Sequence, residues 1–108
     1  MSTANVVRYT AKSPEAAEEN SRLIQQVFAE LAAEDPGSLR YAAFRLADGV
    51  SFVHVSVHEG DSNPLNQSSA FAEFQREIRD RTVEPPAASG ATLVGSYRFL
   101  TEPDAATT

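Results

Sequence analysis

The chain of 108 residues contains no cysteine and no tryptophan, and Lys12 is its only lysine. Without cysteine, the protein can form neither disulfides nor thiolate metal sites, and it has no thiol nucleophile. Acidic residues outnumber basic ones by 15 to 9, so the formal net charge is −6. Nucleic-acid binding depends on basic side chains that neutralise phosphates. We therefore do not expect a nucleic-acid partner.

Long hydrophobic runs are also missing, because the apolar segments fall far short of the roughly 20 residues that cross a bilayer. The opening residues lack the basic region and apolar stretch of a secretory signal. We therefore expect no membrane association and a cytoplasmic location. The length, without a long internal linker, predicts a single domain over residues 1–108. Its core is expected over about residues 5–100, with both ends frayed.

Strand-like alternation opens the chain in the segment VVRYTAK, residues 6–12, and a helix is predicted to follow. Ser13 is a good N-cap, and Pro14 suits the first helical position. The helix should continue to about Ala33, since Pro36 cannot lie within it. Its apolar stripe recurs at helical spacing and consists of Ala16, Asn20, Leu23, Ile24, Val27 and Leu31.

Two alternating runs joined by Asp48 and Gly49 predict a β-hairpin over residues 39–59. An Asp-Gly pair favours a type I′ turn, in which both central residues have positive φ. Pairing outward from this turn places Phe44, Ala42 and Arg40 opposite Val53, Val55 and Val57 on one face. The other face then pairs Arg45 with Phe52, Ala43 with His54, Tyr41 with Ser56, and Leu39 with His58.

A second helix is predicted between the serines at 68 and 69 and the prolines at 85 and 86, with an apolar stripe of Phe71, Phe74 and Ile78. The segment ATLVGSYRFL, residues 91–100, alternates again and is the expected last strand. The order β-α-β-β-α-β is the ferredoxin-like pattern of the α+β class. We expect a four-stranded antiparallel sheet with both helices on one face and the first and third strands in its centre.

In this architecture only one sheet face is covered by helices, and the valines Val53, Val55 and Val57 are expected to face them. Their partners on the first strand would be Val7, Tyr9 and Ala11. The open face would carry Arg8, Tyr41, Phe52, His54, Ser56 and His58, with Val6, Leu39, Val94 and Arg98 as neighbours. Exposed mixed patches of this kind usually bind something. Two such faces packed together would form a homodimer and enclose a small cavity.

The opening "VVRYTAK-SPEAAEENSRLIQQVFAEL" resembles the small dimeric α+β barrel proteins of the antibiotic-biosynthesis-monooxygenase type. It is similar to their strand ending in a lysine, followed by a helix with a proline and acidic start. The element order agrees over about residues 5–100. The resemblance implies a homodimer and either oxygenation of aromatic polyketides or quinols without a cofactor, or haem degradation. Haem degraders of this type use a distorting tryptophan, which this chain lacks, so we expect no cofactor.

His54 and His58 are the only histidines, and their spacing of four residues raises the question of a metal site. On a strand this spacing separates their Cα atoms by about 13 Å. Strand side chains stand roughly perpendicular to the sheet, so both rings would have to turn to share an ion. We therefore expect no metal site within one chain, while a site shared across a dimer axis stays open.

Acid–base chemistry is the better functional interpretation of His54, since an imidazole can move protons near neutral pH. Oxygenation without a cofactor needs a phenol-like substrate in its deprotonated form. We therefore expect His54 to be the catalytic base, with substrate-binding roles for Arg8, Tyr41, Phe52, Ser56 and His58. His54 could instead be a structural histidine in a non-catalytic ligand-binding or interaction dimer. A cavity of about 300 Å³ or more at His54 would favour a ligand site.

Overall fold

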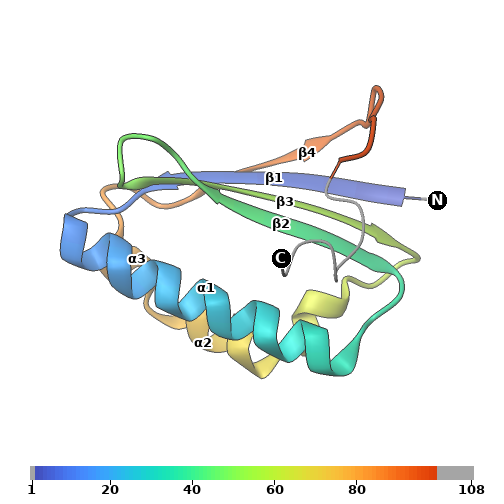
Figure 1. Ribbon diagram of the computed structural model, residues 1–108, viewed down its shortest axis with the longest axis horizontal. Helices are drawn as coiled ribbons and strands as arrows, with labels where there is room; N and C mark the ends of the chain where they lie inside the picture. Colours follow the sequence, from blue (N-terminus) through green and yellow to red (C-terminus); the bar gives the residue numbers. More distant parts are fainter. Residues whose placement is uncertain (1, 100–108) are drawn as a thin grey trace.

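The computed structural model describes residues 2–99. Its elements are β1 (Ser2–Thr10), α1 (Pro14–Glu34), β2 (Leu39–Arg45), β3 (Ser51–Glu59), the short 3₁₀ turn η1 (Pro64–Gln67), α2 (Ser69–Arg76), α3 (Ile78–Arg81) and β4 (Ala87–Ala91). The strands form one antiparallel sheet in the order β2-β3-β1-β4. The helices lie together on one side of this sheet (Figure 1). The ferredoxin-like α+β fold, with β1 and β3 in the centre, is therefore confirmed.

Helix α1 begins and ends as its sequence indicates. The Ser13 hydroxyl accepts a hydrogen bond from the Ala16 amide at 3.0 Å, which caps the N-terminus. At the other end Asp35 adopts a left-handed conformation (φ 51°), and Pro36 follows. The residues buried along this helix are Ala17, Asn20, Leu23, Ile24 and Val27. The predicted stripe is thus largely confirmed, including its one amide, Asn20.

The β2–β3 hairpin has the predicted register, from Leu39 opposite His58 to Arg45 opposite Phe52. Its turn differs from the predicted type I′, because only Gly49 of the Asp-Gly pair has positive φ (81°). The Gly49 amide donates to the Leu46 carbonyl at 2.9 Å, closing a turn over residues 46–49. The Asp48 carboxylate accepts from the amides of residues 50 and 51, which holds this longer loop in place.

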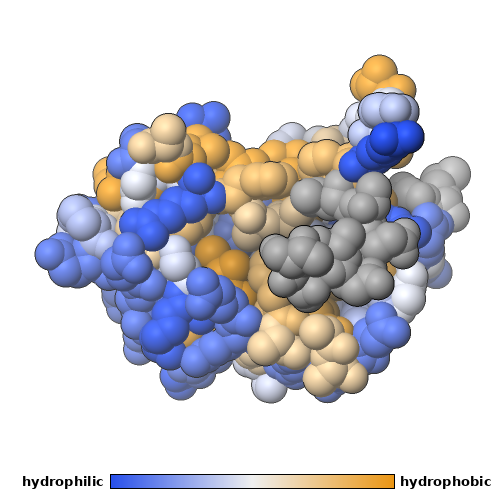
Figure 2. Space-filling view, in the orientation of Figure 1, coloured by the Kyte–Doolittle hydropathy of each residue, from blue (hydrophilic) through white to orange (hydrophobic). Residues whose placement is uncertain are grey.

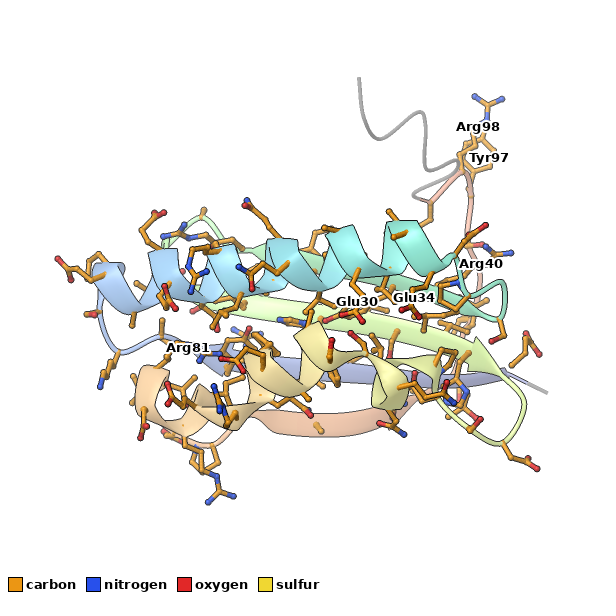
Figure 3. The ribbon with its side chains drawn as sticks, turned by 90° about the horizontal axis from the view of Figure 1, so that it is seen from below. Glu30, Glu34, Arg40, Arg81, Tyr97 and Arg98 are labelled. Carbon is orange, nitrogen blue, oxygen red and sulfur yellow. The ribbon has the colours of Figure 1, made fainter. Side chains whose placement is uncertain are left out.

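The N-terminus of α2 is anchored to α1 by Glu30. The Glu30 carboxylate accepts from the Ala70 amide at 2.7 Å, and it also accepts from the Ser69 amide and the Ser68 hydroxyl. Figure 3 shows Glu30 between α1 and the segment that leads into α2. Ser68 is the N-cap, as predicted, since its hydroxyl accepts from the Phe71 amide. A carboxylate at this position also favours the positive end of the α2 dipole.

The predicted last strand, residues 91–100, is wrong where the structure describes it, and residue 100 lies outside the described residues. Strand β4 is Ala87–Ala91, and these residues pair with Arg8 to Ala4 of β1. Residues 92–99 leave the sheet, so Val94 is 98% exposed and Tyr97 is 80% exposed. Tyr97 belongs to the predicted last strand, and Figure 3 shows it away from the body of the molecule. Small residues at 87–91 provide the edge strand instead.

The N-terminal strand is longer than predicted, since β1 begins at Ser2 rather than at residue 6. It pairs with β3 from Ser2 opposite Glu59 onward, so the described residues at this end belong to the sheet. The other segment expected to fray, residues 102–108, lies outside the described residues. At its far end β1 stops at Thr10, and Ala11 forms a single bridge to Thr82.

The two faces of β3 are the reverse of the prediction. Strand β1 places Val7 opposite His54 and Tyr9 opposite Phe52, which sets both pairs on one side of the sheet. That side is covered by the helices, and it carries the buried residues Phe52, His54, Ser56 and His58 of β3. The valines Val53, Val55 and Val57 and the exposed Arg8 therefore lie on the open face. Val7, Tyr9 and Ala11 face the helices as predicted.

Hydrophilic residues cover the N-terminal half of α1, while apolar residues gather along the sheet layer (Figure 2). None of the helices within residues 2–99 has the length and apolar character needed to span a membrane.

Candidate functional site

A partly open cavity of about 270 Å³ lies on the helix-facing side of the sheet, bordered by η1, α2 and α3. Its apolar wall consists of Val7, Leu65, Phe71, Phe74, Ile78, Pro86 and Ala88. Its polar wall consists of Asn5, Tyr9, Tyr41, His54, Ser56, Asn63, Asn66 and Gln75. Among the described residues, no lysine, arginine, aspartate or glutamate lines it. Although eight of these fifteen residues are polar, the surface that they expose to the cavity is mostly apolar, as in small-molecule sites generally.

Sheet register places His54 between two tyrosines at this cavity. Tyr9 lies opposite Phe52, two residues before His54 on β3. Tyr41 lies opposite Ser56, two residues after His54. Because side chains on a strand alternate with a period of two, all of these residues point to the helix side. Tyr9 and Tyr41 are therefore diagonal neighbours of His54 from the strands on either side of it.

Both ring nitrogens of His54 are hydrogen-bonded. The Tyr9 hydroxyl lies 2.7 Å from Nε2, and the Tyr41 hydroxyl lies 2.6 Å from Nδ1. The two phenol rings are themselves held by stacking: Tyr9 on Phe52 at 5.4 Å between centroids, and Tyr41 on Phe28 at 4.9 Å. The arrangement fixes the orientation of the imidazole and of both hydroxyls.

The hydrogen bonds continue away from the cavity into the helical layer. Asn20 of α1 donates from Nδ2 to the Tyr9 hydroxyl oxygen at 2.8 Å. Arg81 of α3 donates from Nε to the Asn20 side-chain oxygen at 3.2 Å and from Nη2 to the Phe74 carbonyl at 2.7 Å. Figure 3 shows Arg81 between α1 and the layer of α2 and α3. Asn20 is fully buried and Arg81 is 8% exposed, so this chain of polar groups lies in the interior.

Burial sets the charge state of these groups. It lowers the pKa of His54 to about 4, so the ring is neutral near pH 7. Burial raises the pKa of Tyr9 to about 12, against the smaller opposing effect of the Asn20 hydrogen bond. Burial likewise raises the pKa of Tyr41. Both tyrosines are therefore protonated. Arg81 carries the only charge in this series of hydrogen-bonded groups, since an arginine keeps its proton in proteins.

The structure brings together only some of the residues proposed from the sequence. His54, Tyr41 and Ser56 line the cavity, but on the helix side of the sheet rather than on the open face. Phe52 is buried beneath Tyr9 and does not line the cavity. Arg8 is exposed on the opposite face, opposite Val53, so the expected contact of Arg8 with a substrate at His54 is wrong.

His58 was expected at the rim of an open-face pocket, whereas its side chain is buried on the helix side. It does not line the cavity, and its Nδ1 atom has no hydrogen-bond partner among residues 2–99. Within the same residues, no group of three or more histidine, aspartate or glutamate side chains is arranged to hold a metal ion.

Three residues of this hydrogen-bonded series were not predicted from the sequence to belong to the site. Tyr9 was expected to face the helices, Asn20 was one position of a helical stripe, and Arg81 lies in the predicted second helix without an assigned role. Arg76 and Arg79 in the same segment are exposed, but Arg81 is buried. Asn20 carried a usable signal, because an amide in the middle of an apolar stripe requires a polar partner across the interface. That partner had to lie on the sheet face that α1 covers.

No protein-family model matches the chain, and no curated protein matches it by sequence. Solved structures match it over most of its length. A proposed antibiotic biosynthesis monooxygenase from Nitrosomonas europaea is 14% identical, with a TM-score of 0.70 over 86% of this chain and 90% of that one. SnoaB, a cofactor-independent oxygenase from Streptomyces nogalater, is 20% identical, with a TM-score of 0.62 over 94% and 98%.

A third similar structure is the monooxygenase from ActVA-Orf6 of Streptomyces coelicolor, in complex with the ligand nanaomycin D. It is 21% identical, with a TM-score of 0.61 over 88% of this chain and 89% of that one. At these identities the similarity concerns the fold. The resemblance noted in the first strand and helix is thereby confirmed at the level of three-dimensional structure. The chain has the fold of the antibiotic-biosynthesis-monooxygenase-like proteins.

Proposed function

We propose that the protein is a cofactor-independent oxygenase that acts on a small aromatic or quinol-type molecule bound beside His54. The observation that carries the proposal is the buried Tyr9–His54–Tyr41 group at the wall of a mostly apolar cavity. Buried polar networks are costly unless every member is satisfied. A network that reaches a cavity without charged side chains is suited to an aromatic ring that carries one or two oxygens.

The chemistry needs an electron-rich form of the substrate. A phenol or quinol that has lost its proton can pass an electron to O₂, and the two radicals can then combine at carbon. Loss of water from the resulting hydroperoxide leaves a carbonyl, so that overall a ring C–H, the phenolic O–H and O₂ give two carbonyls and H₂O. The protein has to bind the substrate, stabilise its anion and exclude bulk water, and all three tasks suit an apolar cavity with one polar wall.

Cavity size limits the substrate. The volume of about 270 Å³ lies just under the roughly 300 Å³ expected for a ligand site and at the low end for pockets that enclose drug-sized molecules. We therefore propose a substrate with few fused rings. A thermal-shift screen of quinols, small phenols and anthrones would identify candidates through the increase in Tm that ligand binding causes.

Oxygen consumption with the compounds selected in this way tests the proposal. The wild type should consume O₂ in the presence of one of them, and His54→Ala should abolish turnover. Arg8→Ala is the matched control, because Arg8 lies on the opposite sheet face and the substitution should leave turnover intact. Full activity of His54→Ala, or loss of activity in Arg8→Ala alone, would contradict a site on the helix side.

A non-catalytic ligand-binding protein is the second candidate. The observation that favours it is that both ring nitrogens of His54 already have partners, as in a purely structural histidine. Such a protein would bind phenols or quinols in the thermal-shift screen without consuming oxygen with any of them.

We also propose that two copies associate through the open sheet face. That face presents Val6, Val53, Val55, Val57 and Phe44 without a covering helix, and Phe44 is 38% exposed. A contiguous apolar face of this kind on a small protein is typical of an interaction surface, and a second copy of the same face is a complementary partner. Sedimentation at micromolar concentration should give a dimer, and a monomer alone would refute this proposal.

A further inference from the structure

The hydrogen bonds from Arg81 to Tyr41 have a fixed direction. The Nε–H group of Arg81 can only donate, so the side-chain atom of Asn20 that it contacts must be the oxygen. The Asn20 amide nitrogen therefore faces Tyr9 and donates to its hydroxyl oxygen. No other orientation of the amide satisfies both of its neighbours.

The orientation of the Asn20 amide also decides which group donates the hydrogen bond between Tyr9 and His54. Tyr9 has a single hydroxyl proton, and within residues 2–99 its hydroxyl contacts only Asn20 and His54. If His54 instead donated to Tyr9, the proton without an acceptor would be that of Tyr9, which is only 5% exposed, whereas in the other tautomer it is that of the half-buried Tyr41. Tyr9 therefore donates to Nε2 of His54, and the ring carries its proton on Nδ1. That proton is donated to the Tyr41 oxygen, 2.6 Å away.

Tyr41 is the end of the chain, and its own hydroxyl proton has no acceptor among the described residues. Tyr41 also lines the cavity. We propose that Tyr41 binds the substrate by donating this proton to a negatively charged oxygen, as in a phenolate or an enolate, and that Arg81 and Asn20 are positioning residues that set the direction of donation. The choice of substrate class rests on the proposed function.

The electrostatics favour an anion at this end. No charged side chain among the described residues lines the cavity, so an anionic oxygen there depends on oriented dipoles. In the series from Arg81 to Tyr41, each group donates its hydrogen bond to the next group toward the cavity. Successive hydrogen bonds that point the same way polarise one another. The substrate would enter as its anion, with its proton left in the solvent. His54 then orients Tyr41, instead of acting as the base that was expected.

The first test is the position of the proton on His54. Nitrogen-15 NMR of histidine-labelled protein distinguishes the two neutral tautomers, and His58→Gln assigns the signals because the chain has only two histidines. We expect the Nδ1–H form in the wild type. A wild-type ring with its proton on Nε2 would overturn the proposal without the need for any further variant.

Asn20→Asp provides a reversal test with little change in size. An aspartate would accept from both Arg81 and Tyr9, so Tyr9 would accept from Nε2–H of His54, and Tyr41 would donate to Nδ1. The tautomer should switch to Nε2–H, and Tyr41 should lose its free proton. Asn66→Asp is the control, since it adds the same charge to the cavity wall at a residue outside the hydrogen-bonded series from Arg81 to Tyr41. This control should keep the Nδ1–H tautomer of His54. If Asn20→Asp had the same tautomer as the wild type, the role of Asn20 in setting the direction of the hydrogen bonds would be overturned.

Binding of 4-nitrophenol tests the role of Tyr41, because only the phenolate form absorbs visible light. The wild type should bind the phenolate, and Tyr41→Phe and Asn20→Asp should each raise its Kd at least about tenfold. Tyr97→Phe is the control, because it removes a tyrosine hydroxyl that does not line the cavity, and it should leave the Kd unchanged. No binding of the phenolate by the wild type, or equal binding by Tyr41→Phe, would overturn the proposal. A wild type that consumes no oxygen with any phenol would contradict the proposed function alone and leave these results unchanged.

Discussion

The Arg81 guanidinium donates to the side-chain oxygen of Asn20 at 3.2 Å, although 61 residues separate the two in the sequence. The contact joins α3 to the middle of α1 directly beneath the Tyr9–His54–Tyr41 group. Arg81 also donates to the Phe74 carbonyl and lies over the Phe74 ring, 5.3 Å from its centroid. A single buried cation thus holds both the helical layer and the polar end of the cavity.

Arg81→Leu should therefore destabilise the fold. It removes two charge-assisted hydrogen bonds and leaves the Asn20 oxygen and the Phe74 carbonyl without a donor, which should lower the free energy of unfolding by at least about 2 kcal/mol. Urea denaturation followed by circular dichroism would measure the change. Arg79→Leu is the control, because Arg79 is exposed on the same helix and its loss should cost less than about 0.5 kcal/mol. Equal effects of the two substitutions would contradict the structural role of Arg81.

Glu30→Gln should weaken the attachment of α2 to α1, and its effect should depend on pH. The Ala70 amide, followed by the neighbouring Ser68 and Ser69 groups, lowers the pKa of Glu30 below its ordinary value of 4.5. The stabilisation is therefore fully present above the unfolded-state pKa, and it is lost as the pH falls through the lower folded-state value.

The difference in urea midpoint between the wild type and Glu30→Gln should be largest near pH 7 and should shrink in strongly acidic solution. Glu34→Gln, one turn further along α1, changes an exposed side chain and serves as the matched control. A pH-independent difference for Glu30→Gln would show that the substitution acts through packing instead of through the carboxylate.

His54 should make the protein less stable in mild acid. Burial lowers the pKa of His54 in the folded state to about 4, from an ordinary value of 6.5. Between these two values the unfolded chain binds more protons, so stability falls as the pH is lowered from about 6.5 to 4. The loss from this one group amounts to a few kcal/mol at most, at about 1.4 kcal/mol for each unit of pKa shift. Urea titrations of wild type and His54→Phe across this range should converge toward low pH. Parallel curves would contradict a neutral buried ring.

Tyr41→Phe tests the contribution of the hydroxyl group independently of that of the aromatic ring. Phenylalanine can keep the stacking on Phe28 while it removes the hydrogen bond to His54 and the free donor at the cavity. With an oxygenation substrate in hand, kcat/KM should fall by about 10- to 100-fold, the value of one hydrogen bond to a charged group. Near-UV circular dichroism should confirm intact packing. Unchanged kcat/KM would show that the hydroxyl does not contact the reacting anion.

Element order, helix N-caps and hairpin register could be predicted from the sequence because each depends on local chemistry. Ser13 and Ser68 accept the amide three residues ahead, and alternation on β2 and β3 aligns their side chains. The turn type failed because Asp48 uses its carboxylate to bind amides of residues 50 and 51, which suits a negative φ. Asp-Gly on its own does not distinguish the two turns.

Hydropathy could not predict which face of β3 the helices cover, because the more apolar face of this strand is the uncovered one. Its valines lie on the open face, whereas Ser56 and both histidines lie under the helices. Burial of His54 is tolerated because partners on β1 and β2 satisfy both ring nitrogens, and those partners depend on strand order and register together. Asn20 on α1 was the one local sign that the covered face is polar.

Val55→Glu tests the proposed dimer through the open face. Val55 lies in the middle of β3, opposite Val6 on one side and Ala42 on the other. A carboxylate there would have to be buried without a partner if two such faces packed together, at a cost of several kcal/mol for each copy. Analytical ultracentrifugation should show dimeric wild type and monomeric Val55→Glu, with unchanged far-UV circular dichroism. Ala32→Glu adds the same charge to an exposed position of α1 and should stay dimeric. A dimeric Val55→Glu would place the interface on another surface of the protein.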